Sequence, residues 1–192
     1  MLTTTTSKIN IQVRRFTIFD IENLYTYLTH LSPETKKRFG PHKFDKQSIF
    51  DFYRESDKNI GYITLDNENH SIIGYFIIKR GFLAHDRERL EGYRLTLDNQ
   101  TDCTFAPSLA DHWQGSGVGK LVFQFILSDL KKMKFSRIIL WGGVQSDNTR
   151  AVNYYINLGF KTLGQFSHNG NNLDMIYSID QSTGKTDGGF DQ

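Results

Sequence analysis

The segment Trp113-Gln114-Gly115-Ser116-Gly117-Val118-Gly119-Lys120 decides the fold. Residues 101–109 before it have the composition of a strand, and residues 118–133 after it repeat apolar side chains at helical spacing. The first turn of a helix has backbone N–H groups without intrahelical partners and carries partial positive charge, so it can hold a diphosphate. The segment therefore predicts an anion-binding turn between a strand and a helix.

The glycines of this turn allow phosphate oxygens to approach, and their spacing excludes two other nucleotide loops. Gly117 and Gly119 have no Cβ that would collide with a phosphate, and Gly115 can adopt backbone angles that are closed to other residues. A Walker A loop ends in Gly-Lys-Ser/Thr, whereas Leu121 follows Gly119-Lys120 here. A dinucleotide-binding loop needs Gly-x-Gly-x-x-Gly, and Lys120 stands at the last place.

A second pattern lies downstream in residues 148–160, where Asn148, Ala151, Tyr155 and Gly159-Phe160 follow one another. The pair Gln-x-x-Gly-x-Gly and Asn-x-x-Ala-x-x-x-Tyr-x-x-x-Gly-Phe resembles the two signatures of the GNAT superfamily of N-acetyltransferases. The match covers roughly residues 101–165, and the N-terminal half contains no motif.

The resemblance implies an α+β fold with a mostly antiparallel mixed sheet of about 6–7 strands flanked by helices. One domain is expected over residues 9–180, because a chain of 192 residues supports one well-buried core. Residues 1–8 and 181–192 have few apolar side chains, which predicts a flexible N-terminus and a disordered tail.

Periodicity and turn residues predict the order of elements. Strands are expected at 9–17, 60–65, 71–78, 101–109, 137–141, 161–166 and 173–179. Helices are expected at 20–31, 33–40, 45–55, 118–133 and 148–158, with Asp20 and Asp45 as caps. Residues 80–97 are compatible with either a long loop or a strand pair.

Composition excludes several classes of protein. A formal charge of +2 gives no broad basic surface for nucleic acid. No apolar run approaches the roughly 20 residues that cross a bilayer, so no membrane partner is expected. Cys103 is the single cysteine, which excludes an internal disulfide and a cysteine-based zinc cluster. These features predict a cytoplasmic protein without a metal.

The resemblance also implies roles for individual residues. Backbone N–H groups near Leu109 would contact the thioester carbonyl of acetyl-CoA, where the fourth and fifth strands of the family's fold splay apart. Tyr155 is expected to donate a proton to the departing thiolate, since a phenol is protonated at neutral pH. Asn148 is expected to cap its helix and to contact acetyl-CoA. The predicted cofactor-binding residues are Leu109, Gln114, Gly115, Ser116, Gly117, Val118, Gly119, Lys120, Asn148 and Tyr155.

The sequence leaves the general base open. Asp102 and His112 flank the motif region and are the candidates, and a water-linked base is an alternative. Glu91 and His85 in the undecided segment are further candidates. Other titratable side chains have simpler explanations: an inert thiol at Cys103, and a solvated helix face for Lys120, Lys131, Lys132 and Lys134, which could instead contact the nucleotide 3'-phosphate.

The predicted activity is transfer of an acetyl group from acetyl-CoA to a primary amine of a small molecule such as an amino sugar, amino acid or polyamine. Two alternatives remain: acetylation of a protein or peptide amine, with residues 80–97 forming a groove, and a sensor that binds acyl-CoA without catalysis. Pairing of two copies through the C-terminal strands is common in the family, so a homodimer is one expectation.

Overall fold

The computed structural model describes the backbone of residues 2–6 and the whole of residues 9–54 and 57–179. The predicted disordered tail at 181–192 lies outside the described residues. The prediction of a single domain stays a prediction.

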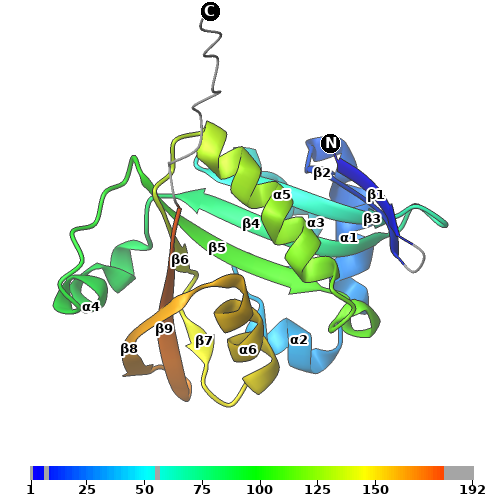
Figure 1. The fold of residues 1–192 in the computed structure, drawn as a ribbon. Coiled ribbons are helices and arrows are strands. Elements are labelled where there is room, and N and C mark those ends of the chain that lie inside the picture. The colour runs from blue at the N-terminus through cyan, green and yellow to red at the C-terminus, as the bar shows by residue number, and fades with distance from the viewer. Residues whose placement is uncertain (1, 7–8, 55–56, 180–192) are drawn as a thin grey trace, which may run out of the picture.

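Nine strands of the described residues form one sheet in the order β1-β2-β3-β4-β5-β6-β9-β7, and β8 pairs with β9 (Figure 1). All neighbouring strands are antiparallel except β5 and β6, which are parallel. The strands are β1 (Leu2–Thr6), β2 (Ile9–Arg15), β3 (Asn59–Asp66), β4 (Ile72–Arg80), β5 (Asp102–Leu109), β6 (Arg137–Leu140), β7 (Val144–Gln145), β8 (Lys161–Ser167) and β9 (Asn171–Ser178). The predicted α+β class with a mostly antiparallel sheet is confirmed.

The sheet has more strands than predicted because two of them have weak sequence signals. β1 lies in the Thr-rich segment that composition predicts to be flexible, yet it pairs with β2 from Leu2 opposite Val13 to Thr6 opposite Ile9. Threonine is β-branched and suits a strand, although it adds little apolar surface. β7 has two residues and pairs with β9.

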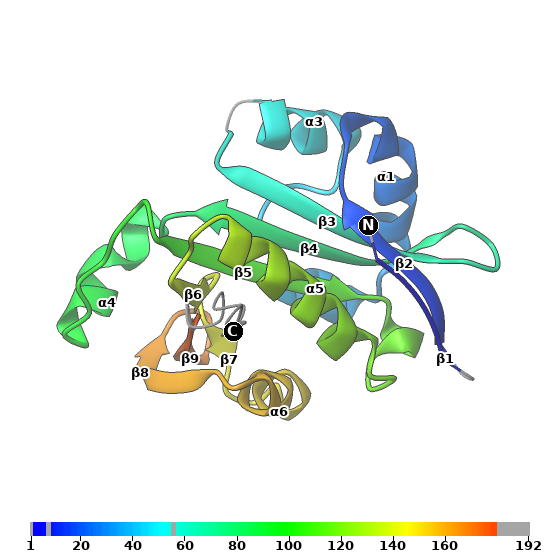
Figure 2. The same cartoon turned by 45° about the horizontal axis from the view of Figure 1, so that its top comes forward.

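Helices cover both faces of the sheet. They are α1 (Ile21–His30), α2 (Pro33–Arg38), α3 (Lys46–Arg54), α4 (Arg87–Gly92), α5 (Val118–Lys132) and α6 (Thr149–Leu158). Figure 2 shows α1 and α3 on one face, and α5 and α6 on the other. The apolar side chains divide in the same way, with Leu24, Leu28 and Ile49 in one core and Val122, Ile126 and Tyr155 in a second core.

Two local predictions need correction. Residues 80–97 form neither a long loop nor a strand pair, because a 3₁₀ turn (η2, Ala84–Asp86) leads into α4 and Leu90 packs into a small core. Asp20 occupies the N-cap position of α1 without capping it by a side-chain hydrogen bond. Its carboxylate instead accepts hydrogen bonds from Arg14, at 2.6 and 2.7 Å, and from the N–H of Thr17.

The parallel pair β5–β6 opens at one end. Its register runs from Asp102 opposite Arg137 to Phe105 opposite Leu140, after which β5 continues to Leu109 without β6 beside it. The chain leaves β6 through Gly142 and Gly143, whose φ angles of 63° and 73° are accessible mainly to glycine. The two strands therefore diverge, as Figure 1 shows, and leave one edge of β5 unpaired.

Candidate active site

The predicted anion-binding turn follows directly from the open end of β5. A short 3₁₀ turn (η3, Asp111–Trp113) leads from Leu109 into the glycine-rich segment, and Gly117 is the N-cap of α5 with a φ of 90°. Gly115 has a φ of 82°, and a Cβ added at either glycine would meet no atom within 4 Å. The backbone conformation therefore favours glycine at both positions, and both face open space.

Backbone amides of this turn are available to a ligand. In the described part of the chain, the N–H groups of Gly115, Gly117 and Gly119 donate no hydrogen bond. Such amides at a helix start, together with the helix dipole, favour a bound anion. The geometry fits the diphosphate of a nucleotide cofactor.

Gly119 also has a packing role. A Cβ at Gly119 would lie 3.0 Å from the ring of Tyr154, so this glycine permits α5 to pack against α6. The Tyr154 hydroxyl donates to the Gly119 carbonyl at 3.0 Å. Val118 is also buried in the core, which leaves only its backbone to contact a ligand.

Side chains around the turn hold it to its neighbours. The Gln114 amide donates to the Leu109 carbonyl at 3.0 Å, and its oxygen accepts from Arg150 of α6 at 2.9 Å. Ser116 Oγ donates to the Trp113 carbonyl at 2.6 Å. The structure thus assigns Gln114 a bridging position between β5 and α6, and it adds Arg150, which the sequence analysis did not single out.

The second motif lies on α6, beside the turn. Asn148 accepts a hydrogen bond from the Ala151 N–H at 3.2 Å and caps the helix, as predicted. The Tyr155 ring packs 5.4 Å from that of Phe160, and burial raises the pKa of its phenol. No hydrogen bond of the Tyr155 hydroxyl is found within residues 9–54 and 57–179, whereas that of Tyr154 is occupied. Tyr155 is therefore the α6 tyrosine with a hydroxyl free for a ligand.

Asp102 does not lie with these residues. It begins β5, whereas the turn follows the other end of this strand, roughly 20 Å away at about 3.3 Å per residue. Its carboxylate is fully buried and receives two hydrogen bonds from Arg137, at 2.7 and 2.8 Å. This environment is that of a structural ion pair.

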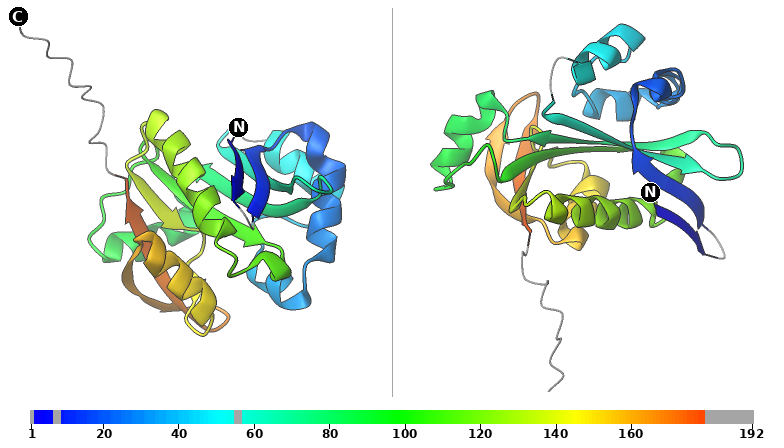
Figure 3. Two further views of the ribbon diagram at one scale, coloured as in Figure 1. Left: turned by 45° about the vertical axis from the view of Figure 1, so that its right-hand side comes forward. Right: turned by 90° about the horizontal axis from the view of Figure 1, so that it is seen from above.

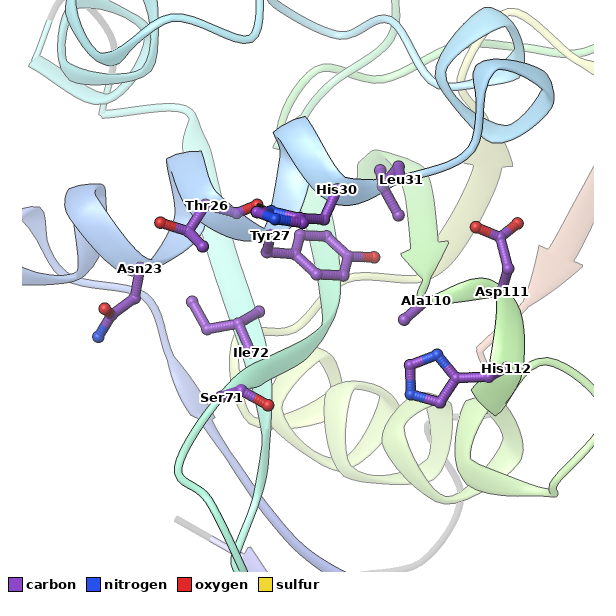
Figure 4. Close-up of a pocket in the computed structure, with 10 residues that line it drawn as sticks. All are labelled: Asn23, Thr26, Tyr27, His30, Leu31, Ser71, Ile72, Ala110, Asp111 and His112. Atoms are coloured by element: carbon purple, nitrogen blue, oxygen red, sulfur yellow. Dashed lines mark hydrogen bonds between the residues drawn. The ribbon is translucent and has the colours of Figure 1, made fainter.

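His112 lies close to the turn in sequence, but on the α1 side. With Asp111 and Ala110 it lines a groove of about 310 Å³ whose other wall is α1 (Figure 4). The groove also contains Asn23, Thr26, Tyr27, His30, Leu31, Ser71 and Ile72. Asp111 accepts hydrogen bonds from Ser32 and Thr35 and so ties η3 to the start of α2.

The remaining candidates are distant or inert. Figures 1 and 3 show α4, which contains Glu91 and follows His85, at the opposite end of the sheet from the start of α5. Burial raises the pKa of the Cys103 thiol. Lys131, Lys132 and Lys134 lie at or just after the C-terminal end of α5, roughly 20 Å from the turn at about 1.5 Å per residue. Of these four lysines, Lys120 lies in the first turn of α5, beside the glycine-rich segment.

An opened parallel strand pair followed by a glycine-rich turn with free amides is the arrangement of an acyltransferase. The chain belongs to the acetyltransferase (GNAT) family, whose profile matches residues 16–160. Members of this family use acetyl-CoA as co-substrate. The chain is thus an acyltransferase, and the predicted family is confirmed.

Solved structures of the family share the fold. The GNAT domain of PAT from S. lividans superposes with a TM-score of 0.68 at 17% identity, covering 88% of this chain and 90% of that one. A variant of the spermidine N-acetyltransferase SpeG from Vibrio cholerae gives 0.62 at 15%, covering 90% and 94%. The ribosomal-protein-S18-alanine N-acetyltransferase from Escherichia coli gives 0.59 at 13%, covering 94% and 99%. No curated protein matches the chain in sequence.

Within the described residues, no helix has both the length and the apolar character of a membrane span.

Proposed function

We propose that this chain transfers the acetyl group of acetyl-CoA to a primary amine of a small molecule, by direct attack in a ternary complex. The observation that carries the proposal is the set of free amides at Gly115, Gly117 and Gly119, which begins one short turn beyond the open edge of β5. A diphosphate on these amides would place the acyl arm of the cofactor along that edge.

The cofactor would be held mainly by backbone groups of this chain. The N–H groups of the turn would bind the diphosphate, with Lys120 as a nearby cation. The Asn148 amide group has donors beyond its capping bond and faces the start of α6. Acetyl-CoA supplies the activated thioester, and the protein supplies position and electrostatic stabilisation.

Leu109 and Tyr155 would assist a single reaction, the nucleophilic substitution at the thioester carbon. The neutral amine nitrogen forms a bond to the thioester carbon, and the carbon–sulfur bond breaks. The Leu109 N–H would stabilise the oxyanion, and the Tyr155 hydroxyl would donate its proton to the departing thiolate. The attacking nitrogen would lose its proton to water, because neither Asp102 nor His112 lies on the open edge of β5.

A small acceptor is supported by the rigid attachment of the elements on the α1 side. Asp111 fixes the start of α2 through Ser32 and Thr35, at 2.9 and 2.7 Å. The loop after α2 is fixed through His42, whose Nε2 lies 3.0 Å from the Tyr75 hydroxyl. Because α2 and the loop after it are fixed in this way, they leave less room for a peptide than for a compact amine. Because acetyl-CoA is an intracellular metabolite, we also place the protein in the cytoplasm.

The proposal is tested by calorimetry of purified protein with acetyl-CoA. We expect binding in the micromolar range, and a loss of at least about 100-fold for Gly117→Val, because a β-branched residue at a φ of 90° is strained and would occupy the phosphate site. Gly92→Ala is the matched control, since a Cβ there meets no atom within 4 Å and its φ is ordinary. Wild-type protein that does not bind acetyl-CoA would refute the proposal.

The acceptor is tested separately. A panel of small amines and a panel of peptides with free amines are incubated with acetyl-CoA, and thiol release and product mass are measured. Faster turnover of the peptide panel would overturn the small-molecule part of the proposal and leave acetyl-CoA binding intact.

A further inference from the structure

The open edge of β5 presents only certain backbone groups to a ligand. The Phe105 carbonyl accepts the Trp141 N–H at 2.9 Å, so the backbone groups of Phe105 face β6. The Ala110 N–H donates to the Ile73 carbonyl at 2.8 Å, so the groups of Ala110 face β4. Successive residues of a strand point their N–H and C=O groups to alternate sides. The backbone groups of residues 107 and 109 therefore lie on the open edge of β5, and those of residues 106 and 108 face β4.

The first of these two open-edge residues is a proline. Pro107 has no N–H and contributes only a carbonyl oxygen to the edge. Leu109 contributes an N–H, while its carbonyl is already occupied by the Gln114 side chain at 3.0 Å. Beyond the last register pair with β6, the edge of β5 thus offers one amide donor.

We infer that Pro107 removes a backbone donor from the open edge of β5, so that the thioester carbonyl depends on the Leu109 N–H alone and acetyl transfer is slowed. This inference rests on the proposed function. The arm of acetyl-CoA also contains amide carbonyls, which compete with the thioester for that N–H. A ligand lying along the edge therefore finds fewer donors than it has acceptors.

A proline at this position has a structural reason that is independent of catalysis. An N–H at residue 107 would lie on the open edge of β5 without a β6 partner, and Pro107 itself is half-buried. An N–H that is shielded from water and has no partner is unfavourable. Proline avoids this group while keeping the extended backbone that pairs with β4. Stability in the absence of ligand therefore favours proline at position 107, whereas polarisation of a bound thioester favours a residue with an N–H.

The test uses Pro107→Ala, which restores the N–H. Infrared difference spectra of bound acetyl-CoA with a ¹³C-labelled thioester carbonyl report hydrogen bonding to that oxygen. We expect the carbonyl stretch to move to lower frequency in the variant than in the wild type. Thiol release with hydroxylamine as the acceptor should rise about tenfold or more, since one oxyanion donor contributes roughly 10²–10³ in kcat in well-studied enzymes. Affinity for acetyl-CoA should change little.

Pro107→Gly also restores the N–H and repeats the test if the alanine variant does not fold, with thermal melting as the check. The wild type gives a third measurement, because its bound carbonyl should show the frequency of a thioester with at most one hydrogen bond. An unchanged frequency and rate in a folded variant would overturn the inference, as would a doubly hydrogen-bonded carbonyl in the wild type. If wild-type protein fails to bind acetyl-CoA, the proposed function falls first and this inference falls with it.

Discussion

The two faces of the sheet are built in different ways. On the α5 side, the turn at Gly115 and Gly117 presents backbone amides to open space. On the α1 side, side-chain hydrogen bonds join segments that are far apart in the sequence, such as Asp111 to Ser32 and His42 to Tyr75. Side-chain hydrogen bonds also join segments on the α5 side, such as Arg150 to Gln114, so the comparison teaches that the two faces differ in the free main-chain amides of the turn.

The largest expected effect tests whether Asp102 belongs to the scaffold. Asp102→Ala leaves Arg137 without its buried partner, and breaking such a pair costs about 3–5 kcal/mol of unfolding free energy. Denaturant unfolding measures this loss, and kcat per folded molecule should stay unchanged. A fall in kcat at wild-type stability would instead place Asp102 in the reaction.

The next effect separates the two adjacent tyrosines of α6. Tyr155→Phe should lower kcat by about 10²-fold at similar acetyl-CoA affinity, because general acid catalysis commonly contributes this much. Tyr154→Phe is the matched control. It removes the bond to the Gly119 carbonyl and should change cofactor affinity more than kcat. Equal effects on kcat from both variants would argue against a proton donor at Tyr155.

A smaller effect concerns pH and the α1 side. His42 donates from Nδ1 to the Lys43 carbonyl at 2.7 Å, so Nε2 accepts from the Tyr75 hydroxyl. Burial lowers the pKa of this imidazole. Its contribution to stability is complete above the unfolded-state pKa of about 6.5, and it is lost as the pH falls through the lower folded-state pKa.

Melting temperatures between pH 8 and pH 5 measure this effect. His42→Phe should flatten the acid side of the profile, and it should cost about 1 kcal/mol at pH 8 because the Tyr75 hydroxyl loses one of its two partners and keeps the Tyr53 hydroxyl at 2.6 Å. His70→Asn is the control, since His70 is exposed and asparagine tolerates its φ of 59°. A profile unchanged by His42→Phe would show that protonation of His42 does not contribute.

The smallest effect concerns the bridge at Gln114. Arg150→Ala should weaken acetyl-CoA binding by about two- to fivefold, because the Arg150 contact is exposed and such contacts contribute about 1 kcal/mol or less. A double-mutant cycle with Gln114→Ala, read by calorimetry, should show coupling between the two positions. Strictly additive losses would mean that the bridge does not organise the turn.

Sequence predicted the α5 side well because its signals are local. Glycine at fixed spacing, the cap at Asn148 and the apolar repeat of α5 each reflect the conformation of a few neighbouring residues. The pairing of β1 and the two-residue β7 could not be predicted, since both depend on partner strands rather than on their own composition.

The α1 side and the general base show the limit of sequence reasoning. Asp102 resembles a catalytic carboxylate until Arg137, which is 35 residues away, is seen to neutralise it. The sequence does, however, contain a signal for the open edge of β5. Pro107 interrupts a central-strand pattern, and proline there indicates an unpaired edge. This signal marks the opening of the β5–β6 pair more specifically than any charged residue nearby.

The single parallel pair has a mechanical consequence. The strands β1–β5 and β6–β9 are two half-sheets that meet through four register pairs and the α5 crossover. A ligand lying between them would act as an additional strand and would stabilise the contact between the two half-sheets. Amide hydrogen exchange at Phe105 and Trp141 should therefore slow when cofactor is present, while exchange within the β3–β4 hairpin should stay the same.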